Sequence, residues 1–272
     1  MSLSIAVTGS GRSGSWRIRG EQLGRAIGAE IITSPIGVNL DRFDIVISVK
    51  RPVVPDHSGS VYDIVDAWPQ PTGNKWIRAD IIRYMKDKAA GFGSLVCATQ
   101  TMADDLGGFF LPHHYRPNIK ESQCPPHVKR VGYEGSRRYL CEWEPVIMAE
   151  CAARGWEWVP DADLTEEPCD ILIALRGAEW QGYGTNNWKS GVKLSNAIGS
   201  LTPLICLPER GYLEYGLPVW TVNGISDIAK AFDALAEHRT RDMMARAYMA
   251  AKPDYSLKSI AERYLAWLAT RY

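Results

Sequence analysis

The segment Lys189–Gly216, KSGVKLSNAIGSLTPLICLPERGYLEYG, decides the fold. Its apolar side chains are spaced so that residues 190–199 form a short helix with one apolar side. Gly199 is expected to end this helix, and Pro203 stands just beyond, where a helix cannot continue. Residues 203–207 then form an apolar run of strand length, which is typical of a strand buried on both faces of a parallel sheet.

Polar side chains gather around the end of this strand and the start of the helix. Ligands of open parallel sheets bind outside the carboxyl ends of the strands. Lys193 stands in the first helical turn, where the helix dipole disfavours a cation unless an anion such as a diphosphate shares the site. A lysine that simply faces solvent is the alternative, and the spacing does not separate the two.

The motif KLSNAIGSLTPLI, followed by GYLE, resembles the donor-binding segment of GT-B-fold glycosyltransferases. In that family the segment holds the ribose and diphosphate of a nucleotide sugar. The residues to which the resemblance assigns donor binding are Lys193, Asn196, Tyr212 and Glu214. A large retaining group carries Glu-x7-Glu here, whereas this chain has Asn187 and Ser195. Neither the stereochemistry nor the ribose contacts of that group are therefore carried over.

The composition is that of a globular protein, with 46% hydrophobic and 23% charged residues. The 272 residues could form one large domain or two domains of about 130 residues each. The zero net charge demands neither nucleic acid nor an anionic membrane as partner. Six cysteines without a Cys-x-x-Cys pair indicate reduced thiols. Without a signal-peptide pattern or an apolar run of about 20 residues, we expect a cytoplasmic protein with no membrane span.

The first predicted strand leads into a glycine-rich turn, Gly9–Gly14, and then a helix. GSGRSG matches Gly-x-Gly-x-x-Gly, the fingerprint of dinucleotide-binding folds. The acidic residue that would end the next strand is missing, because Ser34 and Pro35 stand there. The preferred interpretation is a loop around Gly11 whose backbone approaches a phosphate or an acceptor. A plain tight turn and a nicotinamide or flavin site are the alternatives.

Two further features resemble the acceptor side of GT-B transferases. The helix that contains SWRIRGEQL resembles one in which an arginine near the cleft recurs, so Arg17 and Arg19 are candidates. Asp66 stands in an Asp-x-Trp-Pro ending, which in those enzymes points into the cleft, and is a candidate acceptor-orienting group or general base. A loop-capping role is the alternative. Weaker candidates for this side are His57 and His114. The neighbouring histidines 113 and 114 lack the partners of a metal site.

A second βαβ series begins at Val128, after a proline-containing linker. Its turn VGYEGSRR places Gly135, Arg137 and Arg138 at a predicted helix start, which suits a diphosphate. Many GT-B enzymes carry Val-Gly-x-x-Gly and a basic residue here and use them on the leaving nucleoside diphosphate, although an ordinary surface arginine pair is the alternative. Arg176 ends a later strand and is a further donor candidate. The long loop 177–189 carries aromatic residues suited to stacking a base or sugar.

These patterns predict an α/β protein with two Rossmann-like domains facing each other across a cleft, as in the GT-B fold. The expected parts are an acceptor domain (1–120), a donor domain (128–255) and a helix (256–272) that packs back toward the first domain. The resemblance implies a hexosyl- or pentosyltransferase that moves a sugar from a nucleotide-diphosphate sugar, such as a UDP-sugar, to an acceptor hydroxyl. Neither a metal nor another cofactor is expected, because helix ends and cations neutralise the leaving group.

The acceptor stays open between a small molecule, a glycan, a protein and a hydroxymethylated DNA base, and the chain is expected to be a monomer or homodimer. DNA modification would require a basic stripe, for which the candidates are Arg17, Arg19, Lys50, Arg51, Arg116 and Lys120. Two other classes of function stay open. One is an NAD(P)-dependent oxidoreductase that uses the Gly9–Gly14 loop, and the other is a non-catalytic nucleotide- or glycan-binding protein of the same fold.

Overall fold

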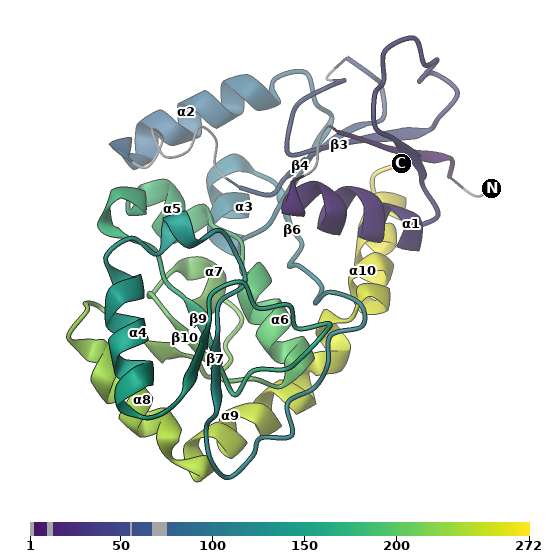
Figure 1. The fold of residues 1–272 in the computed structure, drawn as a ribbon. Coiled ribbons are helices and arrows are strands. Elements are labelled where there is room, and N and C mark those ends of the chain that lie inside the picture. Colours follow the sequence, from purple (N-terminus) through teal and green to yellow (C-terminus); the bar gives the residue numbers. More distant parts are fainter. Residues whose placement is uncertain (1–2, 10–12, 55, 67–74) are drawn as a thin grey trace. The chain divides into compact units, whose positions relative to one another are not determined.

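The computed structural model describes residues 3–9, 13–54, 56–66 and 75–272, which form two α/β units (Figure 1). Unit 1 comprises Met1–His114, Gly182–Gly191 and Leu257–Tyr272. Unit 2 comprises Tyr115–Gln181 and Val192–Ser256. Each unit therefore has its own sheet and its own core.

Unit 1 is built on a six-stranded parallel sheet with strand order β2-β1-β3-β4-β5-β6. Its strands are rich in Ile and Val, and β1, β3 and β4 are buried along their whole length, as expected for a sheet covered on both faces. The strands are β1 (Ile5–Thr8), β2 (Glu30–Ile32), β3 (Ile45–Val49), β4 (Ser60–Ile64), β5 (Ser94–Cys97) and β6 (Phe109–Phe110).

The helices of unit 1 come from three separate stretches of the chain. They are the π-helix η1 (Trp16–Gln22), α1 (Leu23–Ala26), α2 (Arg78–Ala89), α3 (Gln100–Leu106), α5 (Tyr183–Trp188) and α10 (Leu257–Ala269). The last helix, α10, packs beside α1 and buries Ile260, Tyr264 and Leu268 in the core of the β1–β3 region. The expected return of the C-terminal helix to the first domain is thus present.

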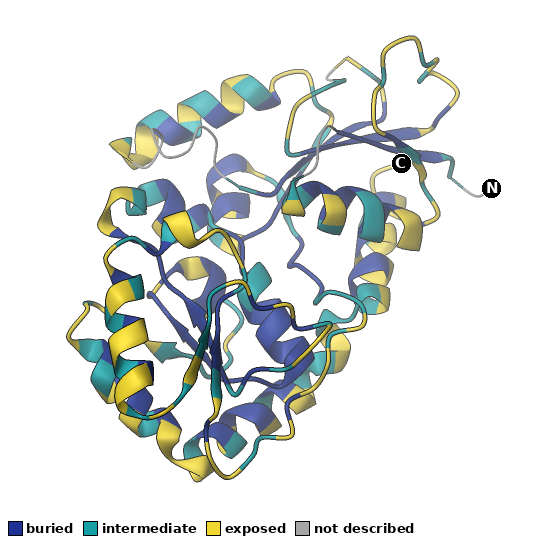
Figure 2. Cartoon of the chain, viewed as in Figure 1, coloured by how far each residue is buried: buried dark blue, intermediate teal, exposed yellow. Residues whose placement is uncertain are grey.

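Unit 2 contains a five-stranded parallel sheet with strand order β11-β10-β9-β7-β8. Its strands are β7 (Arg130–Gly132), β8 (Glu157–Val159), β9 (Ile171–Ala174), β10 (Leu204–Cys206) and β11 (Trp220–Thr221). Its helical elements are η3 (Arg137–Tyr139), α4 (Trp143–Ala153), η4 (Ala178–Trp180), α6 (Val192–Ser200), α7 (Arg210–Leu213), α8 (Asp227–Ala236), α9 (His238–Ala251) and η5 (Lys252–Tyr255). Figure 2 shows the central strands buried and the covering helices exposed on one side.

Helix α6 does not end at Gly199, contrary to the prediction from sequence. Gly199 lies inside the helix, where a Cβ would come within 2.7 Å of Cβ of Tyr115. This glycine therefore makes room for an aromatic side chain. The helix instead ends beside Leu201, which adopts the left-handed conformation with φ of 57°.

The segment expected as a long loop of the second domain, residues 177–189, contains helix α5 and belongs mostly to unit 1. Trp188 is fully buried in a core cluster together with residues of α2 and α3. Its indole Nε1 donates a hydrogen bond of 2.8 Å to Asp105 on α3, and the Tyr183 hydroxyl donates one of 2.6 Å to the same carboxylate. The aromatic residues of this segment therefore anchor it.

Candidate functional sites

In unit 2, polar side chains collect after the carboxyl ends of three neighbouring strands, β7, β9 and β10. Tyr133 directly follows β7, Arg176 follows β9, and Glu209 follows β10. Lys193 joins them from the first turn of α6. This is the edge at which open parallel sheets bind ligands.

Lys193 is held against an aromatic ring. Its ammonium nitrogen lies 3.5 Å from the centroid of the Tyr133 ring, a close cation–π contact. Gly135 has φ of 151°, and a Cβ at this position would lie 3.2 Å from the same nitrogen. The turn predicted from VGYEG therefore passes close to the Lys193 ammonium, and its glycine removes a side chain that would crowd it.

A buried ion pair lies under this edge. Nη1 of Arg176 is 3.3 Å from Oε1 of Glu209, and both side chains are almost fully buried. The hydroxyl of Tyr212 is buried without a hydrogen-bond partner among the described residues, and burial raises the pKa of Tyr212 well above its usual value. The Arg176 guanidinium is thus paired with a buried carboxylate at this edge, and donor binding by Arg176 remains a prediction.

Asn196 bridges two parts of unit 2. Its amide Nδ2 donates a hydrogen bond of 2.9 Å to Glu134, and its Oδ1 accepts one of 3.0 Å from the backbone N–H of Arg116. Burial raises the pKa of Glu134, and the Asn196 hydrogen bond only partly offsets this. Asn196 thus fixes the turn that contains Glu134 and Gly135.

The two arginines predicted to hold a diphosphate have other partners. Arg137 Nε donates a hydrogen bond of 2.7 Å to Glu144, and Arg138 Nη2 donates one of 3.0 Å to the Tyr139 hydroxyl. The Arg138 guanidinium also lies over the rings of Tyr139 and Trp180. Glu214 is half-buried at the carboxyl end of α7. Donor binding by these residues remains a prediction.

In unit 1, Asp66 lies beyond the carboxyl end of β4 and contacts two lysines. Its carboxylate oxygens are 3.1 Å from Nζ of Lys189 and 3.5 Å from Nζ of Lys50. Burial alone would raise the pKa of Asp66, but the two ammonium groups outweigh burial and lower the pKa to about 2. A carboxylate so weakly basic suits an orienting role better than that of a general base.

His113 and His114 end the first segment of unit 1, and both are buried. Burial and the nearby Arg19 charge lower the pKa of His113 well below its usual value and that of His114 to about 3. His114 Nε2 lies 2.9 Å from the Gln22 side-chain oxygen. Both imidazoles are consequently neutral at pH 7.

The predicted placement of Arg19 beside an acceptor needs correction. Arg19 is only 1% exposed, donates a hydrogen bond to the backbone oxygen of Leu111, and lies 3.9 Å from the buried carboxylate of Asp63. Its guanidinium connects the π-helix to β4 and to the residue after β6. It holds the core of unit 1 together and is not accessible to a substrate in this structure.

Other acceptor candidates also have different surroundings from those expected. His57 precedes β4, at the opposite edge of the sheet from Asp66, and its Nδ1 accepts a hydrogen bond of 3.0 Å from the backbone N–H of Gly59. Arg17 is exposed on η1, and Gly11 lies outside the described residues. A Cβ at Gly9 would come within 2.5 Å of the Trp16 ring, so this glycine has a packing role.

Several of the residues expected to form a basic stripe for a DNA acceptor are buried or paired with carboxylates. Arg19 is buried, Lys50 pairs with Asp66, and Arg116 pairs with Glu134 and Asp163. Within the described ranges, no group of three or more His, Cys, Asp or Glu side chains is placed to hold a metal ion. None of the helices in these ranges combines the length and apolar character that crossing a bilayer requires.

Sequence reasoning missed several residues of these edges, although simple signals mark them. Tyr133 and Glu134 lie inside the quoted VGYEG turn, and Lys50 directly follows β3. Inspection of the residues just after the carboxyl end of each predicted parallel strand would have identified all three residues. The contact of Lys189 with Asp66 had no such signal, because the placement of α5 in unit 1 depends on tertiary packing.

The sequence matches no protein-family model, and no curated protein matches it. Solved structures do match. WaaG, a glycosyltransferase involved in lipopolysaccharide biosynthesis, is 14% identical, with 97% of this chain and 99% of WaaG covered and a TM-score of 0.62. HepE of Anabaena, solved in complex with UDP and glucose, is 11% identical, with 97% and 99% covered and a TM-score of 0.65.

AviGT4, a glycosyltransferase involved in avilamycin A biosynthesis, is 12% identical, with 98% of this chain and 97% of AviGT4 covered and a TM-score of 0.61. These matches extend over nearly the whole chain in each case and agree with the two parallel sheets described above. At such low identity they establish the fold. The chain therefore has the GT-B fold of these glycosyltransferases.

Proposed function

We propose that this protein is a glycosyltransferase that binds a nucleotide-diphosphate sugar at the carboxyl edge of the unit 2 sheet. The observation that carries the proposal is the Lys193 ammonium, held 3.5 Å from the Tyr133 ring centroid beside the Gly135 turn and at the start of α6. A cation, a helix N-terminus and a turn without a side chain together suit a diphosphate.

The charges beneath this edge support the same ligand. The buried Arg176–Glu209 pair and the Asn196–Glu134 hydrogen bond hold the surrounding loops in place. A preorganised cation stabilises the charge that develops on a departing nucleoside diphosphate without the cost of reorganising solvent. We therefore assign charge stabilisation to Lys193 and positioning to the buried groups, in a reaction without a metal or a further cofactor.

The acceptor side of the proposal rests on Asp66. With a pKa of about 2, its carboxylate stays ionised at neutral pH and accepts hydrogen bonds from an acceptor or from the two lysines. We propose that Asp66 orients the acceptor hydroxyl, and that the acceptor is a glycan or a small molecule. The buried or paired state of Arg19, Lys50 and Arg116 disfavours a DNA acceptor.

Isothermal titration with UDP tests the donor site, UDP being the nucleotide in the HepE complex. Lys193→Ala is expected to raise the UDP dissociation constant at least tenfold, equivalent to about 1.4 kcal/mol. Lys230→Ala, which removes an exposed lysine of the same unit, serves as the matched control and should bind UDP like the unmodified protein.

Titrations with GDP and ADP establish whether another base is preferred, and NAD tests the oxidoreductase alternative. Equal affinity of Lys193→Ala and the unmodified protein for the preferred nucleotide would remove Lys193 from the site. Tight binding of NAD without binding of any nucleoside diphosphate would replace the proposal by the oxidoreductase. Nucleotide binding without hydrolysis or transfer of a matching nucleotide sugar would indicate a non-catalytic binding protein.

A further inference from the structure

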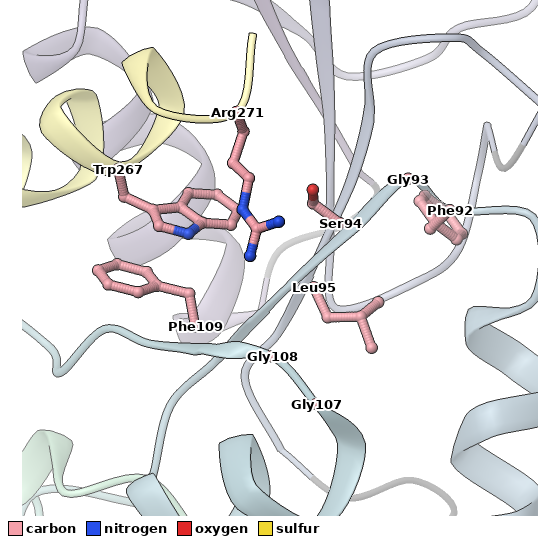
Figure 3. A pocket seen from close by; sticks show the side chains of 9 residues that line it. All are labelled: Phe92, Gly93, Ser94, Leu95, Gly107, Gly108, Phe109, Trp267 and Arg271. Atoms are coloured by element: carbon pink, nitrogen blue, oxygen red, sulfur yellow. The ribbon is translucent and has the colours of Figure 1, made fainter.

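A separate cavity lies at the amino ends of strands β5 and β6 in unit 1 (Figure 3). It has a volume of about 370 Å³. Ser94 opens β5 and Phe109 opens β6, whereas Asp66 follows the carboxyl end of the neighbouring strand β4. The cavity is therefore at the opposite edge of the sheet from the proposed acceptor side.

One wall of the cavity contains a stacked pair of aromatic rings. The rings of Phe109 and Trp267 are stacked with centroids 4.9 Å apart and an angle of 8° between their planes. The Trp267 ring also packs against Tyr264, whose side chain is buried. This packing fixes the wall before any ligand binds, and the ring pair offers apolar contact area to a ligand.

The charge of the cavity is positive. Arg271 is the only charged side chain among the nine residues that line it in the described part of the chain, and Figure 3 shows its guanidinium directed into the space beside Trp267. A guanidinium binds a carboxylate or phosphate through two parallel hydrogen bonds. The cavity therefore suits a ligand that carries an anionic group on one side and apolar C–H groups on the other.

Two glycines, Gly107 and Gly108, also line the cavity. Gly107 ends α3 in the left-handed conformation, with φ of 77°, and a Cβ there would meet nothing within 4 Å. A Cβ at Gly108 would lie 2.8 Å from Sγ of Cys97, so the chain approaches β5 closely at this point. The Ser94 hydroxyl lies 3.4 Å from the Tyr272 hydroxyl and adds a polar group to the wall.

We propose that this cavity is a non-catalytic binding site for an anionic saccharide unit. The carboxylate or phosphate of the sugar binds Arg271, and the apolar C–H groups of its ring pack against the Phe109–Trp267 pair. An inorganic anion would use only the charge, and a neutral sugar only the aromatic surface. The proposal goes beyond sugar transfer and does not depend on the donor site.

The indole ¹H–¹⁵N signal of Trp267, assigned with Trp267→Phe, reports binding at this cavity. Glucuronate and glucose 6-phosphate are expected to shift the signal saturably, and their relative affinities distinguish a carboxylate from a phosphate ligand. Arg271→Ala should raise the dissociation constant at least tenfold. Arg263→Ala removes an exposed arginine of α10, the helix that precedes Arg271, outside the cavity and should leave binding unchanged. Lys193→Ala should also bind acidic sugars normally, which separates this site from the donor site.

The proposal is overturned if glucose or inorganic phosphate binds as tightly as the acidic sugars, because one feature alone would then account for binding. It is also overturned if Arg271→Ala and Arg263→Ala behave alike. The proposal is likewise overturned if the Trp267 signal shows no saturable shift up to roughly 20 mM acidic sugar, a concentration well above a millimolar dissociation constant.

Discussion

Replacing Asp105 by alanine tests the anchoring of α5 in unit 1. The Asp105 carboxylate is 1% exposed and accepts hydrogen bonds from Trp188, Tyr183 and Arg78. The substitution leaves the buried indole N–H of Trp188 without its acceptor, which costs about 1–3 kcal/mol. Tyr183 is half-buried and the Arg78 side chain is 64% exposed, so water can replace part of the hydrogen bonding that these two groups lose. Losing their contacts with Asp105 therefore adds only about 1 kcal/mol to the destabilisation.

We therefore expect Asp105→Ala to lower the free energy of unfolding by about 2–4 kcal/mol. Urea denaturation followed by tryptophan fluorescence measures this change. Asp105→Asn retains one acceptor oxygen, so its free energy of unfolding should fall by roughly half as much as that of Asp105→Ala. Asp104→Ala provides the matched control, because Asp104 is exposed on the same helix and its carboxylate accepts an exposed hydrogen bond from Gln100. This substitution should change the free energy of unfolding by less than about 0.5 kcal/mol.

The pH dependence gives a second measure of the same interaction. Burial alone would raise the pKa of Asp105, but hydrogen bonds from Tyr183, Arg78 and Trp188 outweigh it and lower the pKa. A carboxyl with a lowered pKa in the folded state contributes stability above its unfolded pKa of about 3.9, and the contribution is lost as the pH falls through the folded value. The stability difference between the unmodified protein and Asp105→Ala should thus shrink below about pH 4. Equal stability of Asp105→Ala and Asp104→Ala at pH 7 would refute the anchoring role.

Two further substitutions test other contacts of the fold. Gly199→Ala should lower the free energy of unfolding by about 1–2 kcal/mol in urea denaturation, because overlap with Tyr115 exceeds the gain in helix propensity. Gly14→Ala is the control and should leave the free energy of unfolding unchanged, since a Cβ there meets nothing within 4 Å. Equal effects of the two substitutions would contradict the packing explanation. Asp66→Asn should lower the free energy of unfolding by about 2 kcal/mol at pH 7, which is the equivalent of lowering the pKa of Asp66 from 3.8 to about 2 on folding. Because the folded carboxyl has the lower pKa, this difference in stability should disappear as the pH falls toward 2. A difference that persists at low pH would show that Asp66 does not act through its charge.

The parallel sheets and the return of the last helix were predictable because they depend on local patterns. Apolar runs such as residues 203–207 identify buried strands, and α10 carries its apolar residues at helical spacing. Gly199 shows the limit of such reasoning. A glycine near the end of a helix usually caps it, and the tertiary contact with Tyr115 that keeps this one inside α6 leaves no local signal.

The sites show the same division between local and tertiary information. Lys193 and Gly135 belong to turns with recognisable motifs, and the structure brings them together. Arg19 also belongs to a recognisable motif, but its burial depends on Asp63 and Leu111, which are 44 and 92 residues away along the sequence. Motif reasoning identifies which residues occupy an element, whereas the partner of a long charged side chain is decided by packing.

The titration properties of unit 1 bear on how a hydroxyl acceptor is activated. Asp66 has a pKa of about 2, and the buried His114 has a pKa of about 3. A general base is most effective when its pKa lies near the working pH, so both groups are poor bases at neutral pH. In the proposed reaction, Asp66 is instead a permanent anion that orients the acceptor by hydrogen bonding. The charge of the leaving diphosphate would then be stabilised by Lys193 of unit 2. For the proposed transfer, we therefore expect the rate to depend more on charge placement in unit 2 than on proton transfer to the described side chains of unit 1.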